Sequence, residues 1–343
     1  MRTPNRPRGA ARRAPLTAMR RAPLTGMRRA ALIGALACAL ALVGCSGGGK
    51  GGAVTTSVQV VTTVPELVGG DAIFRNDSAK PLDPQRSSNG KYEQVSFLAN
   101  DGQRIPGLLA LPANATGPYP CVVVQHGLDS SKADAVQFLD TINNAGSGAI
   151  AIDARIHGDR GTRAQREAAF KDPAAMRDVL VASVRDLRRT LDYLATIPQC
   201  DPTRTGYLGF SLGAIMGAMV SGVDTRVHAA ALLSGGGDWD VMLAGTSNPF
   251  LQSYKNPAKR AQAVQMLAPI DPDVWIPKMA GRSVFFANGT RDDVIVPASA
   301  RALHDAAKDP KQVVWWDGGH SPEGLQVATT FNALVQWYQA NFS

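Results

Sequence analysis

Residues 206–214 read GYLGFSLGA, and Gly209, Ser211 and Gly213 form a Gly-x-Ser-x-Gly pattern within them. An apolar run that predicts a buried strand precedes the serine, and the small residues at 212–220 predict a helix after it. A serine at the tip of such a sharp strand-to-helix turn needs strained backbone angles, and the flanking glycines let strand and helix pass closely. The stretch therefore predicts a nucleophile elbow.

The chain on both sides of this pattern alternates between short apolar runs and longer amphipathic runs. The runs predict strands at 92–97, 105–111, 121–125, 149–153, 229–234, 283–287 and 312–316, and helices at 132–145, 173–197, 298–307 and 322–342. An Asn-Asp-Gly turn at 100–102 makes the first two strands a hairpin. We therefore expect an α/β fold with a mostly parallel central sheet flanked by helices. Residues 240–281 interrupt the alternation and predict a small helical lid insertion.

A serine hydroxyl becomes a strong nucleophile only when a base removes its proton and an acid orients that base. His320 follows the expected strand 312–316 in a glycine loop and is the predicted base. Asp292 and Asp293 follow the expected strand 283–287, and the residues alone leave both open as the acid. The sequence thus offers Ser, Asp and His in chain order, each at the carboxyl end of a strand.

The other four histidines have more ordinary interpretations. His304 lies in an expected helix and is predicted to be a surface or packing residue, and His228 precedes an expected strand and is predicted to be structural. His126 follows strand 121–125 and is expected to order the next loop without transferring protons. His157 lies after strand 149–153, where it either borders a pocket or orders its loop by a hydrogen bond.

Residues 92–343 resemble an α/β-hydrolase of the dienelactone-hydrolase or prolyl-oligopeptidase-like branch. The stretches that carry the resemblance are His126-Gly127, the 185–194 run leading to Asp201, the elbow, Gly289-x-x-Asp292 and Gly319-His320. The family's Gly-x-x-Asp pattern selects Asp292 as the acid, with Asp293 as the alternative one register later. The resemblance also implies an oxyanion hole made by the backbone N–H groups of Leu128 and Leu212, and neither a metal nor an organic cofactor.

These features predict a serine esterase that cleaves carboxylic esters of small molecules through an acyl-enzyme. Peptides, thioesters and lactones are alternative substrates, since the same triad serves them. The peptidase interpretation is weaker because residues 46–91 are too few for the β-propeller of prolyl-oligopeptidase relatives. A non-catalytic ligand-binding lipoprotein is the alternative of another class. Substrate identity, acyl-chain length and oligomeric state cannot be read from the sequence.

Residues 1–45 predict an export signal. Nine arginines lie in the first 29 residues, and subtracting them from the formal charge of +8 leaves about −1, so the basic balance gives no support for nucleic-acid binding. The apolar run 30–43 is short for a membrane span and fits a signal peptide. It ends in Leu42-Val-Gly-Cys45, which resembles the lipobox of bacterial lipoproteins. We expect lipidation at Cys45 and an extracytoplasmic, membrane-anchored protein, although the true start codon stays open.

Residues 46–91 are expected to form a tether and a loosely specified N-terminal segment before the hydrolase domain at 92–343. Beyond the leader the chain has two cysteines, Cys121 and Cys200. In an oxidising compartment they could form a disulfide, but their distance cannot be read from the sequence.

Overall fold

The computed structural model describes residues 70–113 and 115–342. The predicted signal peptide, the lipidation site Cys45 and most of the predicted tether lie outside these residues. Within the described part, a single sheet contains β1 (Gln85–Asn89), β2 (Tyr92–Leu98), β3 (Arg104–Ala110), β4 (Tyr119–Gln125), β5 (Gly148–Ile152), β6 (Cys200–Phe210), β7 (Val227–Leu233), β8 (Ser283–Gly289) and β9 (Lys311–Trp316).

The strand order in the sheet is β1-β2-β3-β5-β4-β6-β7-β8-β9. Strands β1, β2, β3 and β5 pair antiparallel in turn, and the strands from β5 through β4 to β9 pair parallel. The predicted α/β fold, with a mostly parallel sheet and an antiparallel hairpin at one edge, is confirmed. Because parallel strands end at the same edge, the loops after β4, β5, β6, β7, β8 and β9 meet there.

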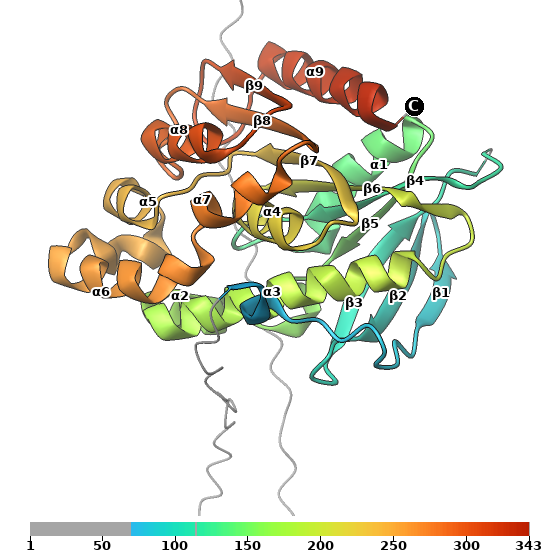
Figure 1. The fold of residues 1–343 in the computed structure, drawn as a ribbon, viewed down its shortest axis with the longest axis horizontal. Helices are drawn as coiled ribbons and strands as arrows, with labels where there is room; N and C mark the ends of the chain where they lie inside the picture. The colour runs from blue at the N-terminus through green and yellow to red at the C-terminus, as the bar shows by residue number, and fades with distance from the viewer. Residues whose placement is uncertain (1–69, 114, 343) are drawn as a thin grey trace, which may run out of the picture. The chain divides into compact units, whose positions relative to one another are not determined.

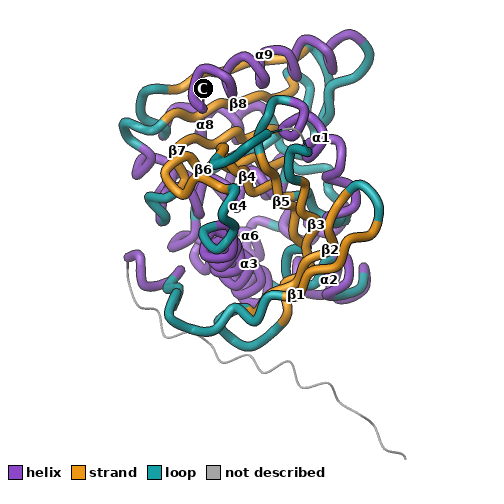
Figure 2. The backbone as a smooth tube through the Cα atoms, turned by 90° about the vertical axis from the view of Figure 1, so that its right-hand side faces the viewer, coloured by secondary structure: helices purple, strands orange, loops and turns teal. Residues whose placement is uncertain are grey.

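Helices cover both faces of the sheet (Figures 1 and 2). One face packs against α1 (Val136–Asn144) and α9 (Leu325–Phe342), and the other against α3 (Pro173–Leu194), α4 (Leu212–Val223) and α8 (Pro297–Ala306). Successive side chains of a strand point to opposite faces of the sheet. Val122 and Val124 therefore pack in the core with α1 and α9, whereas Val123 packs in the core with α3 and α4. This two-sided burial explains the continuous apolar runs of the central strands.

The sheet begins earlier than the predicted domain boundary at Tyr92. β1 pairs with β2 from Gln85 to Asn89, and the 3₁₀ turn η1 (Gly70–Phe74) packs on α3. The expectation of a loosely specified segment up to residue 91 is therefore wrong for residues 70–91. The polar composition of this segment gives no pattern of apolar residues from which its structure could be predicted. Much of it is held in place through its backbone carbonyls, which act as hydrogen-bond acceptors whatever the side chains are.

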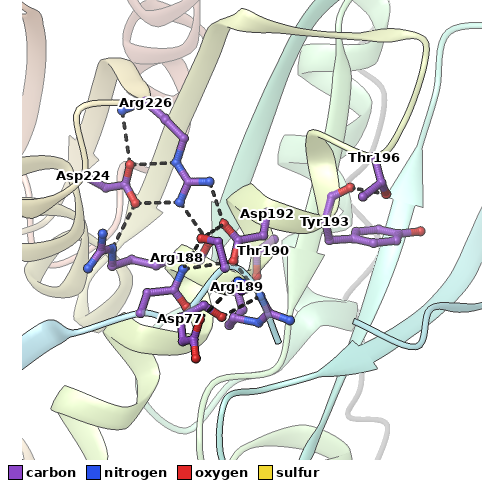
Figure 3. Close-up of polar contacts among 12 residues, drawn as sticks. Asp77, Arg188, Arg189, Thr190, Asp192, Tyr193, Thr196, Asp224 and Arg226 are labelled. Carbon is purple, nitrogen blue, oxygen red and sulfur yellow. Dashed lines mark hydrogen bonds and ion pairs between the residues drawn. The ribbon is translucent and has the colours of Figure 1, made fainter. Parts of the chain in front are cut away.

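Arginines of α3 supply the donors for those acceptors. Arg185 donates to Ile73 O, Arg188 to Phe74 O, and Arg189 to the carbonyls of Asp77, Lys80 and Pro81. Arg189 is fully buried and pairs with Asp192, which also accepts from Arg226 (Figure 3). The segment before β1 is thus fixed to α3 by charge-assisted hydrogen bonds.

Residues between β7 and β8 form the helical insertion that the sequence predicts at 240–281. It contains α5 (Trp239–Gly245), η4 (Pro249–Lys255), α6 (Pro257–Leu267), η5 (Ala268–Ile270), α7 (Pro272–Trp275) and η6 (Ile276–Met279). It packs against α2 (Arg163–Lys171), α3, α4 and α8. In the described part of the chain, no helix combines the length and apolar character of a membrane span.

Candidate active site

Ser211 lies between β6 and α4 with φ +56° and ψ −117°, a conformation that non-glycine residues rarely adopt. The flanking glycines make the turn possible. A Cβ at Gly209 would overlap the carbonyl of Gly213, and a Cβ at Gly213 would overlap the carbonyl of Gln125. The Ser211 N–H donates to Leu233 O at the end of β7, which fixes the turn against the neighbouring strand. The local geometry is that of the predicted nucleophile elbow.

Three side chains from three loops meet at this turn. His320 Nε2 lies 2.8 Å from Ser211 Oγ, and His320 Nδ1 lies 2.8 Å from Asp292 Oδ2. The other carboxylate oxygen of Asp292 accepts from the N–H groups of Val294 and Ile295 at 2.8 and 2.9 Å. A carboxylate so held accepts the Nδ1–H of His320, which leaves Nε2 free to accept the Ser211 proton.

Asp293, the alternative acid, points elsewhere. Its side chain is exposed, and its backbone carbonyl accepts from Ser247 N–H of the insertion. Asp292 is buried and is the carboxylate in contact with His320. The structure therefore brings together Ser211, Asp292 and His320 and leaves Asp293 outside.

The acid loop and the base loop are joined by contacts that the sequence did not indicate. Thr290 N–H donates to Trp316 O, and Arg291 N–H donates to Gly318 O. Ser234 Oγ, at the end of β7, donates to His320 O at 2.7 Å. In the sequence, the one feature that indicates a role for Ser234 in holding His320 is its position at the carboxyl end of a strand. These bonds hold the His320 backbone beside Ser211.

The two predicted oxyanion donors belong to peptides that are close to the serine. Leu212 opens α4, so its N–H has no acceptor within the helix. Gly127, which precedes Leu128, approaches the nucleophile so closely that a Cβ on it would lie 3.2 Å from Ser211 Cβ. Both peptides are thus next to the serine, as a hole for a tetrahedral oxyanion requires.

The remaining histidines are held by hydrogen bonds or lie on the surface. His126 Nδ1 lies 2.8 Å from Gly127 O, and His157 Nδ1 lies 2.7 Å from Arg155 O, so each orders its own loop. Burial lowers the pKa of His157 to about 3 and that of His304 to about 4, which keeps both rings neutral. His228 is exposed on β7.

Cys121 and Cys200 are joined by a disulfide in the structure, with Cα atoms 5.4 Å apart. The bridge connects the beginnings of β4 and β6, the strands that lead to the oxyanion loop and to Ser211. Across residues 70–113 and 115–342, no group of three or more His, Cys, Asp or Glu side chains has a metal-binding arrangement.

Four aromatic side chains of the insertion region have almost no exposed surface. All four are buried in the core around α3 and α4, and they are Trp239, Phe250, Tyr254 and Trp275. Trp275 packs edge-on against Phe74, and the Arg163 guanidinium lies 5.0 Å from the centre of the Phe250 ring. Their role in the structure is packing of the insertion onto the domain.

Comparison with known proteins places the chain in a family. Residues 76–340 match the model of the acetyl xylan esterase (AXE1) family. The chain is 27% identical to the putative hydrolase YtaP of Bacillus subtilis (strain 168) over 180 residues, which span 48% of this chain and 60% of YtaP. It is 26% identical to the esterase YjfP of Escherichia coli (strain K12) over 245 residues, 66% of this chain and 94% of YjfP.

Among solved structures, the fold is similar to that of the acetyl xylan esterase from Paenibacillus sp. R4. The TM-score is 0.65 with 21% identity, and the match covers 81% of this chain and 97% of that one. The α/β-hydrolase that the elbow and the two loops predict is thereby confirmed. The chain belongs to the acetyl xylan esterase family and is a carboxylesterase-like serine hydrolase.

Proposed function

We propose that this protein hydrolyses small carboxylic esters, and acetyl esters in particular, through an acyl-enzyme on Ser211. The observation that carries the proposal is the pair of 2.8 Å contacts that link Ser211 Oγ through His320 to Asp292. The acetyl group is favoured because the matching family model and the Paenibacillus structure are both described as acetyl xylan esterases.

In the proposed first half-reaction, Ser211 Oγ bonds to the ester carbonyl carbon while His320 Nε2 takes its proton. Asp292 orients the Nδ1–H and stabilises the imidazolium that forms. The N–H groups of Leu128 and Leu212 stabilise the carbonyl oxygen as it becomes negative. His320 then returns the proton to the departing alcohol. In the second half-reaction His320 takes a proton from a water molecule whose oxygen bonds to the acyl carbon. The proton then passes to Ser211 Oγ as its bond to the acyl carbon breaks, which releases the acid and restores the serine.

Peptides, thioesters and lactones are the alternative substrates, since the fold itself does not select among acyl compounds. A ligand-binding lipoprotein without catalysis is the alternative of another class, and it requires an unreactive Ser211.

The first test uses the purified protein beside its Ser211→Ala variant. We expect a fluorophosphonate probe to label the native protein and not the variant. We also expect p-nitrophenyl acetate to be cleaved faster than the octanoate, and acetylated xylan to release acetate. Labelling without ester turnover would move the search to peptides, thioesters or lactones. Absence of labelling would contradict the enzymatic proposal.

We further propose that the protein is exported and anchored by lipid on Cys45. The lipobox-like Leu42-Val-Gly-Cys45 supports this, and so does the Cys121–Cys200 bridge, since such bridges persist in oxidising compartments. Cys45→Ser is expected to release the protein from the membrane fraction. Unchanged membrane association of this variant would disprove lipid anchoring at this position.

A further inference from the structure

Several non-glycine residues at the carboxyl edge of the sheet have positive φ, Ser211 and Ser234 among them, and two others lie in the loops after β4 and β5. Asp129, immediately after the proposed oxyanion residue Leu128, has φ +62°, and Ile156, in the loop after β5, has φ +57°. Positive φ is unusual for any residue with a side chain and most unusual for a β-branched one. Such conformations persist only where the surroundings impose them, and they gather at functional sites.

One side chain contacts both of these strained residues. Arg166, on α2, donates from Nη2 to Asp129 Oδ1 at 2.6 Å and from Nη1 to Ile156 O at 3.2 Å. Its side chain is 10% exposed, whereas that of Asp129 is 33% exposed. A planar guanidinium with two fixed donors is suited to holding two acceptors at once. Arg166 therefore fixes the loop after β4 relative to the loop after β5.

Asp129 directly follows Leu128, whose peptide bond with Gly127 lies close to the nucleophile. In a planar trans peptide the Gly127 C=O and the Leu128 N–H point in opposite directions. His126 Nδ1 holds the Gly127 carbonyl, and Asp129 holds the chain on the other side of Leu128. Rotation of this peptide is thus restrained from both ends, and its N–H stays directed away from His126.

A second arginine also pairs with Asp129, but in a different environment. The Arg163 side chain is 60% exposed and contacts the other carboxylate oxygen. Solvent screens such a pair, so it contributes little to holding a geometry. Arg166 is the partner with the buried guanidinium and the second anchor at Ile156.

We propose that Arg166 is a positioning residue for ester hydrolysis, which acts through Asp129 to aim the Leu128 N–H at the oxyanion. The proposal rests on the proposed esterase function. It predicts that loss of Arg166 weakens transition-state stabilisation while the Ser211–His320–Asp292 contacts stay intact.

The test compares Arg166→Gln and Arg166→Lys with the native protein, with all rates divided by the concentration of sites that a fluorophosphonate titrates to completion. We expect kcat for p-nitrophenyl acetate to fall about 10- to 100-fold in Arg166→Gln, with KM changed less than threefold. The kcat of Arg166→Lys should lie between those of the native protein and Arg166→Gln, since one ammonium group cannot hold both acceptors. The inhibition constant of a trifluoromethyl ketone, which forms a tetrahedral adduct, should rise in proportion to the loss in kcat/KM.

Arg177→Gln is the matched control. Arg177 lies on α3 with a side chain that is also 10% exposed, and it pairs with Asp178, its neighbour in the same helix. We expect its rate per titrated site to be unchanged. A purely structural role of Arg166 would lower the number of titratable sites or the melting temperature but leave kcat per site and the ketone affinity unchanged, and that result would overturn the proposal.

A double-mutant cycle tests the route through Asp129. In an Asp129→Ala background, adding Arg166→Gln should cost less than twofold, because the contact is already absent. Fully multiplicative losses would show that Arg166 acts by another route and would refute the proposal. If the proposed esterase function itself were wrong, the native protein would cleave no ester, which is a different result from either outcome of the Arg166 experiments.

Discussion

His126 has a defined protonation state in this structure. Its Nε2 accepts the Ala154 N–H at 3.1 Å, so the proton must be on Nδ1, which donates to Gly127 O. Burial lowers the pKa of His126 and keeps the ring neutral. A protonated ring would have no acceptor for Ala154. The neutral tautomer is therefore what holds the Gly127 carbonyl and, with it, the peptide beside Ser211.

Replacement of His126 by alanine should release that carbonyl. We expect kcat for p-nitrophenyl acetate to fall about 10- to 100-fold per titrated site, because a misdirected oxyanion donor loses most of its value. His126→Asn, whose amide can donate to the carbonyl, should lose less. His228→Ala, at an exposed position on β7, is the control and should be unaffected. A rate for His126→Ala within twofold of native would contradict this role.

The side chains proposed to react were predictable because each has a local sequence signal. Ser211 has its glycines, His320 and Asp292 follow late strands, and Leu128 and Leu212 are given by chain position relative to these. The sequence contained no indication of a role for Arg166. The helix α2 that carries it has a polar sequence, and neither Asp129 nor Ile156 lies in a sequence pattern that predicts positive φ. The contacts of Arg166 with the Asp129 carboxylate and the Ile156 carbonyl appear only once the sheet brings the ends of β4 and β5 together.

The first turn of α7 contains Asp273, whose carboxylate lies against Gly237 in the glycine segment after β7. Asp273 lies beside Gly237, where a Cβ would overlap its carboxylate, and its buried Oδ1 has no hydrogen-bond partner among the residues described. Burial first, and then the charges of Asp271 and Asp238, raise the pKa of Asp273 to about 7. At neutral and higher pH this carboxylate therefore opposes the packing of α7.

Asp273→Asn should stabilise the protein, and more at pH 8 than at pH 5. The folded-state pKa exceeds the ordinary value of 3.8, so the native state binds the proton more tightly. The penalty is absent below about pH 4, grows as the pH rises and is complete above about pH 7. We expect a gain of about 1–2 kcal/mol in unfolding free energy at pH 8, allowing for partial solvent exposure.

Urea unfolding of the native protein, Asp273→Asn and the exposed Glu323→Gln at the two pH values measures this effect. Glu323→Gln should follow the native protein at both. An equal gain for Asp273→Asn at pH 5 and pH 8 would show that the titration of Asp273 is not its cause.

Sequence patterns predicted the apolar strands and failed to predict the polar strand β1 and the polar segment before it. The strands at 121–125 and 149–153 are buried on both sides and appear as continuous apolar runs, so their prediction was straightforward. β1 reads QRSSN and is an edge strand whose residues 85–88 are exposed, so no periodicity identified it. The segment before β1 is held by arginines of α3, which is a long-range contact invisible to local patterns.

The domain as a whole is braced by the disulfide between Cys121 and Cys200, which are separated by 79 residues. Closing a loop of that length restricts the unfolded chain and is typically worth about 2–4 kcal/mol. The double variant Cys121→Ala/Cys200→Ala should therefore melt about 5–10 °C lower than the oxidised protein.

Thermal unfolding with and without reductant checks this expectation, because reduction should lower the native melting temperature and leave that of the double variant unchanged. Mass analysis of the native protein should find no free thiols at these positions. Two free thiols in protein isolated from its natural compartment would contradict the bridge.

The insertion between β7 and β8 is joined to the loop of the proposed acid by main-chain atoms. All five groups of the proposed mechanism lie outside residues 240–281, and the insertion meets the loop of Asp292 through a backbone bond from Ser247 N–H to Asp293 O. Any residue except proline can supply that N–H. The link between the insertion and the loop of the acid therefore survives any exchange of the side chain at position 247 other than to proline.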